Sequence, residues 1–276
     1  MDTKQLGQTG IQIPEVGYGT WKHQGDPATV RRALELGAFL IDSAESYDTE
    51  RYVGQAIAGN RDAYFLATKV SPSHFRYDDV LKSAEASLKA LGTDVIDLYQ
   101  LHWPSGDVPI EETMRAMDKL VSDGKVRHIG VSNFSVELLA AAEAELGEGR
   151  IVENQIKYSL LDHEFADEVI PYCAERGMTV FAYSSLEQGA FEARVAERPQ
   201  LGEMLDSIGA DLGKTRAQLL LNWVIWEPNV ITIPMTNRVE RVDENCGASG
   251  WRLSADERTA LTDAAGAGAT RRWWKA

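Results

Sequence analysis

Short apolar runs that alternate with amphipathic helical stretches predict an α/β fold, a (β/α)8 TIM barrel. Eight runs are rich in β-branched and aromatic residues, and a polar turn and a helical stretch follow each one. Strands that alternate with helices pair in parallel through right-handed crossovers, and eight such units close naturally into a barrel. Polar residues at the ends of several runs stand where a barrel carries its chemistry.

The first segment, KQLGQTGIQIP, predicts a short N-terminal β-hairpin turned at GQTG that closes the bottom of the barrel. The eight predicted strands follow at residues 15–20, 38–42, 64–70, 95–102, 126–132, 151–158, 178–184 and 230–235. Residues typical of helix starts open four helical stretches, at Asp26 before Pro27, Asp78, Ser135 and Thr215. We expect a single domain over residues 1–276, with a flexible tail at 264–276.

A doubly wound open sheet is the competing architecture. Such a sheet usually carries a GxGxxG turn after its first strand, to receive a dinucleotide. The corresponding segment, GYGTWK, lacks the third glycine, and that spacing occurs nowhere else in the chain. The barrel is therefore the favoured fold.

Composition and charge narrow the class of protein. A net charge of -14 opposes binding to nucleic acid, and the longest apolar stretch, LLLNWVIW, is too short to cross a membrane. Cys173 and Cys246 are the only cysteines, so a disulfide framework is not expected and the cytoplasm is the predicted location. We expect no metal site and no obligate protein partner, hence a monomer that binds a small molecule.

Four polar residues follow or end the early apolar runs: Asp42, Tyr47, Lys69 and His102. A tyrosine hydroxyl titrates near ~10 in water, so Tyr47 needs a nearby positive charge to donate a proton at neutral pH. Lys69 can supply that charge, and Asp42 can compensate the buried ammonium and fix its position. A neutral His102 can orient a carbonyl oxygen beside the tyrosine. Together they predict protonation of a carbonyl oxygen while another group attacks its carbon.

These residues lie in segments that resemble the aldo-keto reductase family from about residue 3 to residue 263. LIDSAESYDTERYVGQAI resembles the family's first signature, and ATKV and DLYQLHWP carry Lys69 and His102. IGVSNF and ITIPMTNRVERVDEN resemble the segments that bind nicotinamide and the adenosine phosphate. The resemblance implies a TIM barrel that binds NADP(H), with direct hydride transfer to an aldehyde or ketone and Tyr47 as the general acid.

The resemblance also implies a set of cofactor contacts. Ser132, Asn133 and Gln155 would bind the carboxamide, and Tyr183 would stack on the nicotinamide. The remaining contacts would be Ser184 and Leu186 for the pyrophosphate, Thr236 and Arg241 for the 2′-phosphate, and Glu244 and Asn245 for the adenine.

The chain departs from the family pattern at Met235, where many members carry a lysine. Loss of that cation should weaken discrimination for the 2′-phosphate, so NAD(H) stays open as a cofactor beside NADP(H). Arg238 is placed either to replace the missing charge or to face solvent on its helix.

Trp21 and Trp103 each follow a strand end, which predicts a substrate pocket for an apolar or aromatic carbonyl compound. Packing against the barrel is the alternative role for both side chains. The tail that carries Trp273 and Trp274 either folds over this pocket or is loose.

Two other functions are compatible with the same residues. A regulatory subunit of this fold would bind the cofactor and act through a protein partner. A lyase would use Lys69 to form a Schiff base, which requires a lysine that loses its proton readily. The neighbouring Asp42 opposes that requirement because a carboxylate keeps the amine protonated.

Overall fold

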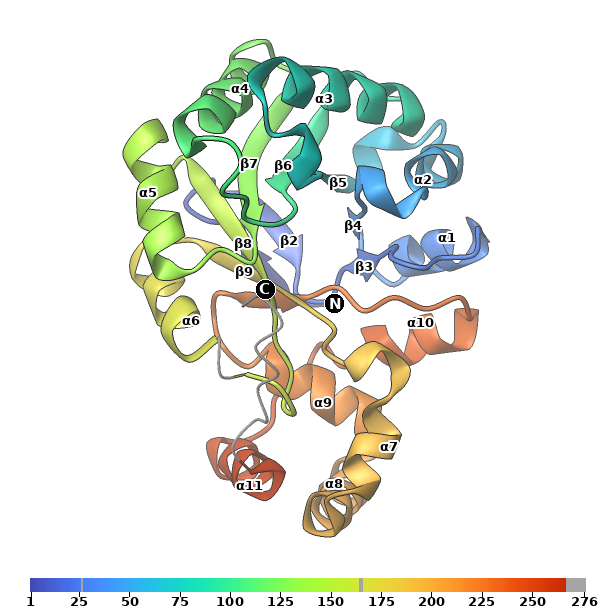
Figure 1. The fold of residues 1–276 in the computed structure, drawn as a ribbon. Coiled ribbons are helices and arrows are strands. Elements are labelled where there is room, and N and C mark those ends of the chain that lie inside the picture. Colours follow the sequence, from blue (N-terminus) through green and yellow to red (C-terminus); the bar gives the residue numbers. More distant parts are fainter. Residues whose placement is uncertain (26, 164–165, 267–276) are drawn as a thin grey trace.

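The computed structural model describes residues 1–25, 27–163 and 166–266 (Figure 1). Within this part of the chain, eight parallel strands pair in the order in which they occur in the sequence. They are β3 (Tyr18–Gly19), β4 (Leu40–Asp42), β5 (Phe65–Val70), β6 (Ile96–Leu101), β7 (Val126–Ser132), β8 (Ile151–Lys157), β9 (Thr179–Tyr183) and β10 (Val230–Thr232). Helices surround them in Figure 1, and the predicted barrel is confirmed.

The first and last strands close the barrel through a short parallel contact between Val16 and Thr232. The Gly17 N–H donates to the Thr232 carbonyl at 2.8 Å, and the Thr232 N–H donates to the Glu15 carbonyl at 3.0 Å. β3 and β10 are shorter than predicted because these flanking residues pair only through a few isolated bonds. The apolar runs at 15–20 and 230–235 nevertheless form the seam of the barrel, the line along which its first and last strands meet.

Eight helices follow the strands in turn within the described ranges, and three more are additions to the barrel. The former are α1 (Pro27–Glu35), α2 (Glu50–Ile57), α3 (Tyr77–Leu91), α4 (Ile110–Ser122), α5 (Val136–Leu146), α6 (Ala166–Glu175), α9 (Arg216–Val224) and α10 (Val239–Cys246). The additions are α7 (Phe191–Ala196), α8 (Pro199–Leu212) and α11 (Ala255–Ala265). Single 3₁₀ turns lie at Glu45–Tyr47 (η1), Arg61–Ala63 (η2), Pro72–His74 (η3) and Glu187–Gly189 (η4).

The predicted helix starts have mixed outcomes. Ser135 and Thr215 accept hydrogen bonds from backbone N–H groups of α5 and α9, as predicted. Asp78 is wrong as a cap: α3 begins at Tyr77 after Arg76, and Asp78 lies in the first turn, where its charge suits the helix dipole. Pro27 begins α1, whereas Asp26 lies outside the described residues.

The predicted tail begins too early. α11 extends to Ala265, so the first two residues assigned to the tail are helical. The predictions for Trp273 and Trp274 lie outside the described residues.

The N-terminal hairpin pairs β1 (Thr3–Gln5) with β2 (Gln12–Pro14) in antiparallel register, as predicted. Its Leu6 and Ile13 are fully buried in a cluster with barrel residues, so the hairpin covers one end of the barrel. Lys4 joins the hairpin to the segment that leads into β10. Its ammonium donates to the carbonyls of Ile225, Glu227 and Val230 at 2.5, 2.6 and 2.6 Å.

Replacing Lys4 with methionine is expected to lower the free energy of unfolding by about 2 kcal/mol, because hydrogen bonds from a charged donor are lost. Chemical denaturation of both proteins measures the difference. Lys82→Met is the control, because the Lys82 side chain is 75% exposed and its ion pair is with Asp79, three residues before it on the same helix. An effect for Lys4→Met no larger than that of the control would contradict the role of Lys4.

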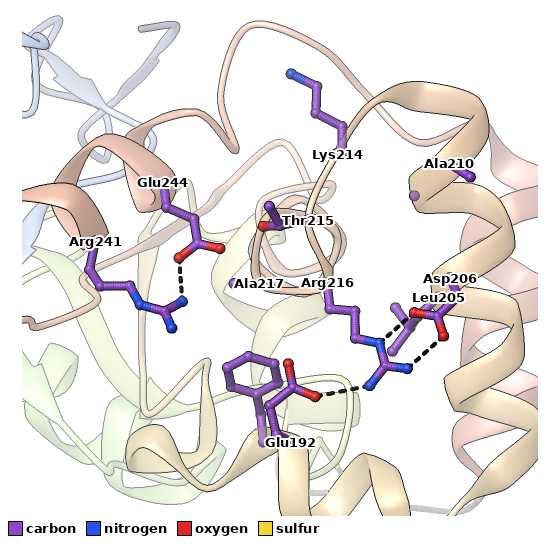
Figure 2. A pocket seen from close by; sticks show the side chains of 12 residues that line it. Glu192, Leu205, Asp206, Ala210, Lys214, Thr215, Arg216, Ala217, Arg241 and Glu244 are labelled. Atoms are coloured by element: carbon purple, nitrogen blue, oxygen red, sulfur yellow. Dashed lines mark hydrogen bonds and ion pairs between the residues drawn. The ribbon is translucent and has the colours of Figure 1, made fainter.

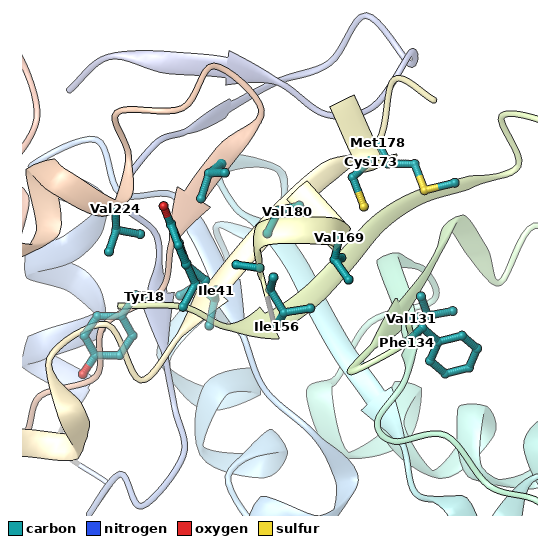
Figure 3. Close-up of a cluster of buried hydrophobic side chains, with 14 of the residues drawn as sticks. Tyr18, Ile41, Val131, Phe134, Ile156, Val169, Cys173, Met178, Val180 and Val224 are labelled. Atoms are coloured by element: carbon teal, nitrogen blue, oxygen red, sulfur yellow. The ribbon is translucent and has the colours of Figure 1, made fainter. Parts of the chain in front are cut away.

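The main hydrophobic core lies between the outer faces of the strands and the helices. Figure 3 shows part of it, with Ile156 and Val180 of neighbouring strands near Val169 of α6. A smaller cluster, which includes Leu40, Leu98 and Phe181, joins the hairpin. Apolar side chains therefore close the barrel at the hairpin end, and polar groups are left to the other end.

One irregularity interrupts the β7–β8 pairing. Ile129 pairs with Ile151 and Gly130 pairs with Glu153, so Val152 is an extra residue in β8. Ile151 belongs to the outer core, whereas Val152 belongs to the cluster beneath the hairpin. The bulge thus changes which residues of β8 face the barrel interior.

Candidate active site

Asp42 and Lys69 form a buried ion pair inside the barrel. Asp42 ends β4 and pairs with Ala67 of β5, which places Lys69, two residues later, on the same face. The Lys69 ammonium donates to Asp42 Oδ1 at 2.5 Å and to the Ser43 carbonyl at 2.8 Å. Lys69 is fully buried and Asp42 is 2% exposed, so the lysine charge is held in place away from water.

Tyr47 and His102 complete the cluster of four polar residues. Tyr47 ends the η1 turn that follows β4, and His102 directly follows β6. Tyr47 Oη lies 3.2 Å from His102 Nε2, and the Lys69 ammonium lies 5.0 Å from the centre of the tyrosine ring. The structure therefore brings all four sequence-predicted residues together.

The η1 turn aims Tyr47 at the barrel because both of its ends are fixed. Asp48 adopts a left-handed conformation, with φ of 58°, and ends the turn. Glu45 accepts a hydrogen bond from the Ser71 N–H at 2.6 Å and contacts His74 Nδ1 at 2.9 Å. Sequence reasoning missed this anchoring role of Glu45, since no local pattern links it to residues 71–74.

Burial and the lysine charge act together on the protonation of the cluster. Burial and the Lys69 charge lower the pKa of His102 to about 3, so its imidazole is neutral at physiological pH. Burial alone would lower the pKa of Lys69, but the charge of Asp42 and its hydrogen bond to the ammonium contribute to raising it above its usual value. Lys69 therefore remains an ammonium.

Burial raises the pKa of Tyr47, while Lys69 opposes the shift by stabilising the tyrosine anion. The expected influence of Lys69 is present, but in this structure burial outweighs it. The hydroxyl is therefore protonated at neutral pH, as a proton donor must be.

Two glutamines surround the free oxygen of Asp42. Gln100 Nε2 and Gln155 Nε2 donate to Asp42 Oδ2 at 3.1 and 3.0 Å, and Gln155 also donates to Gln100 Oε1 at 3.0 Å. Gln155 was expected to bind a carboxamide, and here its amide is engaged with Asp42. Gln100 was missed, although a buried polar residue inside a strand is the same signal that singled out Lys69.

The residues expected to bind nicotinamide lie together at the ends of β7, β8 and β9. Asn133, with φ of 63°, follows β7 and donates to the His102 carbonyl at 3.3 Å. The Tyr183 hydroxyl donates to Asn133 Oδ1 at 2.9 Å, and Ser132 Oγ donates to the Gln155 carbonyl at 3.0 Å. These bonds hold an aromatic face and several amide-binding groups beside the cluster of Asp42, Tyr47, Lys69 and His102, the tetrad.

The loop after β9 has an unusual backbone. Ser184, Glu187 and Gln188 all adopt positive φ angles, of 56°, 51° and 56°. Leu186, between them, packs against the hydrophobic core. Non-glycine residues rarely adopt such angles, so the loop has a defined shape at the place expected for the pyrophosphate.

The residues expected to bind the adenosine end lie at and after β10. Thr236 is held by its carbonyl, which accepts a hydrogen bond from the Tyr18 hydroxyl at 2.7 Å. Arg241 pairs with Glu244 on α10, and Asn245 of the same helix is buried. Met235 and Thr236 are both half-buried, so the methionine stands beside the expected phosphate position without a charge.

Arg238 precedes α10 with a side chain that is 67% exposed, and it lies 3.7 Å from Glu240. Of the two roles left open by the sequence, this geometry fits the solvent-facing arginine. Arg241 is therefore the better candidate to recognise a phosphate.

A pocket of about 390 Å³ lies beside this end of the site, between α8, α9 and α10 (Figure 2). Arg241 and Glu244 line it from α10, and Lys214 and Arg216 line it from the other side. Arg216 is engaged with Asp206 and Glu192 (Figure 2). No residue of the tetrad lines this pocket.

Trp21 and Trp103 lie at the mouth of the barrel. Trp103 lies next to His102, with ring centres 6.2 Å apart and planes inclined by 29°. Trp21 is 38% exposed, and the Lys22 ammonium sits 4.1 Å from the centre of its ring. Both are placed to contact a substrate, and that role stays a prediction.

A parallel barrel with a buried lysine, a tyrosine and a neutral histidine at the strand ends has the features of an oxidoreductase acting on carbonyl groups. A model of the family described as "Aldo/keto reductase family" matches residues 15–265. A methylglyoxal reductase of Escherichia coli is 34% identical over 275 residues, covering 96% of this chain and 95% of that protein. The chain belongs to the aldo/keto reductase family.

Solved structures agree with this assignment. A thermostable aldo-keto reductase in complex with the inhibitor epalrestat has a TM-score of 0.88 and 36% identity, covering 96% of this chain and 100% of the other. An aldo/keto reductase from Klebsiella pneumoniae in complex with NADP and acetate has a TM-score of 0.85 and 34% identity, covering 95% and 94%. The predicted class, an NADP-dependent oxidoreductase that reduces carbonyl compounds, is confirmed.

Among the described residues, no helix is both long enough and apolar enough to cross a membrane.

Proposed function

We propose that this protein reduces an aldehyde or ketone with Tyr47 as the general acid. The observation that carries the proposal is the arrangement of Tyr47 between two groups: the Lys69 ammonium, 5.0 Å from its ring centre, and His102 Nε2, 3.2 Å from its hydroxyl. When bound, NADPH supplies the hydride that the carbonyl carbon accepts. Tyr47 gives its proton to the carbonyl oxygen, and the nearby ammonium stabilises the tyrosine anion that remains.

His102 serves as a neutral hydrogen-bonding group rather than as an acid. Because burial and Lys69 lower its pKa to about 3, its ring carries one N–H at physiological pH. A donor beside Tyr47 can hold the carbonyl oxygen in the position from which it takes the tyrosine proton.

The residues beside the tetrad suit NADP(H). Asn133, Ser132 and Gln155 offer the amide and hydroxyl groups that a carboxamide needs, and the Tyr183 ring is fixed by its bond to Asn133. Ser184 and Leu186 would border the pyrophosphate. At the other end Arg241 would bind the 2′-phosphate, Thr236 would donate to it, and Glu244 and Asn245 would bond the adenine.

The cofactor preference has its own test. Replacing Arg241 with alanine is expected to weaken NADPH binding about tenfold, because a charge-assisted bond to the 2′-phosphate is lost. NADH binding should change little, since NADH lacks that phosphate. Fluorescence titration of both cofactors measures the change, with Arg238→Ala, at the residue that precedes the same helix, as the matched control. NADH that binds the native protein as tightly as NADPH would contradict the preference.

The substrate we propose is a small aldehyde or an apolar or aromatic carbonyl compound. Trp21 and Trp103 support it by their place at the barrel mouth, and the relatives named methylglyoxal reductase extend it to 2-oxoaldehydes. Loss of NADPH absorbance with aliphatic, aromatic and dicarbonyl substrates tests the proposal. Failure of all of them, with NADPH still bound, would favour the regulatory alternative.

The lyase alternative has less support. Lys69 donates to Asp42 and to the Ser43 carbonyl, and Asp42 contributes to raising its pKa. Its amine is therefore protonated and lacks the free pair that a Schiff base requires. Borohydride trapping with substrate checks this directly, because covalent labelling at Lys69 would favour the lyase.

We also propose a cytoplasmic monomer that folds as a single domain over residues 1–276. The single domain is supported by the barrel, which is closed by the contact between Val16 and Thr232. The cytoplasmic location is supported by the count of only two cysteines in the sequence. Light scattering, cell fractionation and a single unfolding transition test the three parts separately.

A further inference from the structure

Glu153 places a second carboxyl group in the barrel interior, near the tetrad. The bulge at Val152 turns Glu153 inward, and a Cβ added to Gly130 would lie 2.2 Å from Glu153 Oε2. The same position would be 3.0 Å from Gln100 and 3.1 Å from Leu98, two side chains of β6. Glycine at position 130 therefore leaves the space that the Glu153 carboxyl occupies.

The Glu153 carboxyl is isolated from water and from hydrogen-bond donors. Glu153 is fully buried, and neither of its side-chain oxygens has a hydrogen-bond partner among the described residues. A carboxylate in such a place costs far more free energy than an uncharged acid. Burial and the charge of Asp42 raise the pKa of Glu153 well above its usual value, although Lys69 acts in the opposite sense.

The charged groups that act on Glu153 come from two neighbouring strands, and a thiol outside the barrel responds to its charge. Asp42 of β4 and Lys69 of β5 are the charges within the barrel, and Glu153 in turn raises the pKa of Lys69. On α6, outside the barrel, Cys173 has a pKa raised to about 12 by burial and by nearby carboxyl groups that include Glu153. Among the described residues, Lys69 is thus the one group whose positive charge lowers the pKa of both Glu153 and Tyr47.

We propose that Glu153 is a positioning residue that shares the Lys69 charge with Tyr47. While its carboxyl is uncharged, the ammonium is compensated by Asp42 alone and can stabilise the Tyr47 anion. Once Glu153 loses its proton to solvent, its carboxylate competes for the same ammonium, and Tyr47 ionises less readily. This inference deepens the proposed function and rests on the role of Tyr47 in it.

Glu153→Gln tests the proposal because the amide keeps the size of the side chain and cannot ionise. The alkaline limb of the kcat/KM profile for carbonyl reduction should move to lower pH in this variant, since Tyr47 keeps the whole influence of Lys69. Activity at neutral pH should change less than about threefold, because the native Glu153 is uncharged there. Superimposable alkaline limbs in the two proteins would overturn the proposal.

Glu143→Gln is the matched control. Glu143 is 6% exposed and also has a side-chain oxygen without a partner among the described residues, but it lies on α5, outside the barrel. Its replacement should leave the pH profile unchanged. Should Glu153→Gln fail to fold, Glu153→Met removes the same charge with a side chain of similar length.

Two measurements test this inference without turnover, a tyrosinate titration and a denaturation series. Their failure can therefore be told apart from failure of the proposed function, which is tested by turnover. Tyrosinate absorbance, taken as the difference from Tyr47→Phe, should show a lower pKa for Tyr47 in Glu153→Gln than in the native protein. An equal Tyr47 pKa in both overturns the inference, whereas turnover that survives in Tyr47→Phe overturns the proposed function.

Denaturation at several pH values supplies the second measurement. The pKa of Glu153 is raised in the folded state, so the folded protein keeps a proton that the unfolded chain loses above its ordinary pKa. Native stability should therefore fall as the pH rises from that ordinary pKa toward the folded one, relative to Glu153→Gln. Parallel stability curves would show that Glu153 is not held as an acid and would overturn the inference.

Discussion

Replacing Tyr47 with phenylalanine is expected to lower kcat for carbonyl reduction by about 10³-fold while NADPH still binds. Phenylalanine keeps the ring beside Lys69 and removes only the hydroxyl that lies 3.2 Å from His102. The loss follows because His102 cannot take over the role of the tyrosine: its pKa is about 3, so its imidazole is neutral at physiological pH and is a poor proton source. Stopped-flow absorbance of NADPH, together with fluorescence titration, measures rate and binding separately.

The neighbouring hydroxyl of Ser46 provides the control for this variant. Ser46 precedes Tyr47 in the same turn, and its hydroxyl lies 3.4 Å from His102 Nδ1. Ser46→Ala should change kcat far less than Tyr47→Phe, because the serine is on the other side of the imidazole. Comparable losses in both variants would mean that the geometry of the turn, and not the tyrosine proton, limits the reaction.

Replacing Lys69 with methionine is expected to lower kcat by about 10²-fold or more and to lower the free energy of unfolding by about 3 kcal/mol. The rate falls because the Tyr47 anion loses its stabilising charge. Stability falls because Asp42, which is 2% exposed, is left without its ammonium partner. Among the described residues it keeps the amide donors of Gln100 and Gln155. Steady-state kinetics and urea denaturation measure the two effects.

A double variant separates these two effects. Adding Asp42→Asn to Lys69→Met removes the uncompensated carboxyl and should restore part of the lost stability. The rate should stay low, since no positive charge returns beside Tyr47. Recovery of rate along with stability would show that Lys69 acts through folding alone.

The sequence predicted the barrel, and the clustering of the four tetrad side chains within it, because both leave strong local signals. Each strand is an apolar run of the right length, and a charged residue such as Lys69 inside a strand has few structural explanations. The additional helices α7, α8 and α11 were not distinguished from barrel helices, since amphipathic periodicity does not say which surface a helix covers. The sequence also could not predict how the first and last strands pair, because the isolated bonds near Val16 form only when the whole sheet closes.

The supporting residues of the site were harder to predict. Gln100 donates to Asp42 across the barrel, and Glu45 bonds a turn 26 residues away, so their partners are set by the tertiary fold. Glu153 is the clearest case: strict strand alternation gives no account of a bulge at Val152, and the space above Gly130 exists only once β7 and β8 pair. Long-range geometry therefore decides what these polar groups do.

The apolar closure of the barrel beneath the tetrad sets the route by which protons travel. Leu40, Leu98 and Phe181, together with Leu6 and Ile13 of the hairpin, are fully buried and offer no side-chain group that can relay a proton. If Tyr47 is the acid, as we propose, the proton that it gives up in each cycle must be replaced from the open end of the barrel, where Trp21 and Trp103 follow the strand ends. Reprotonation of the tyrosinate would then depend on departure of the product, because the alcohol leaves and the next proton enters through the same opening.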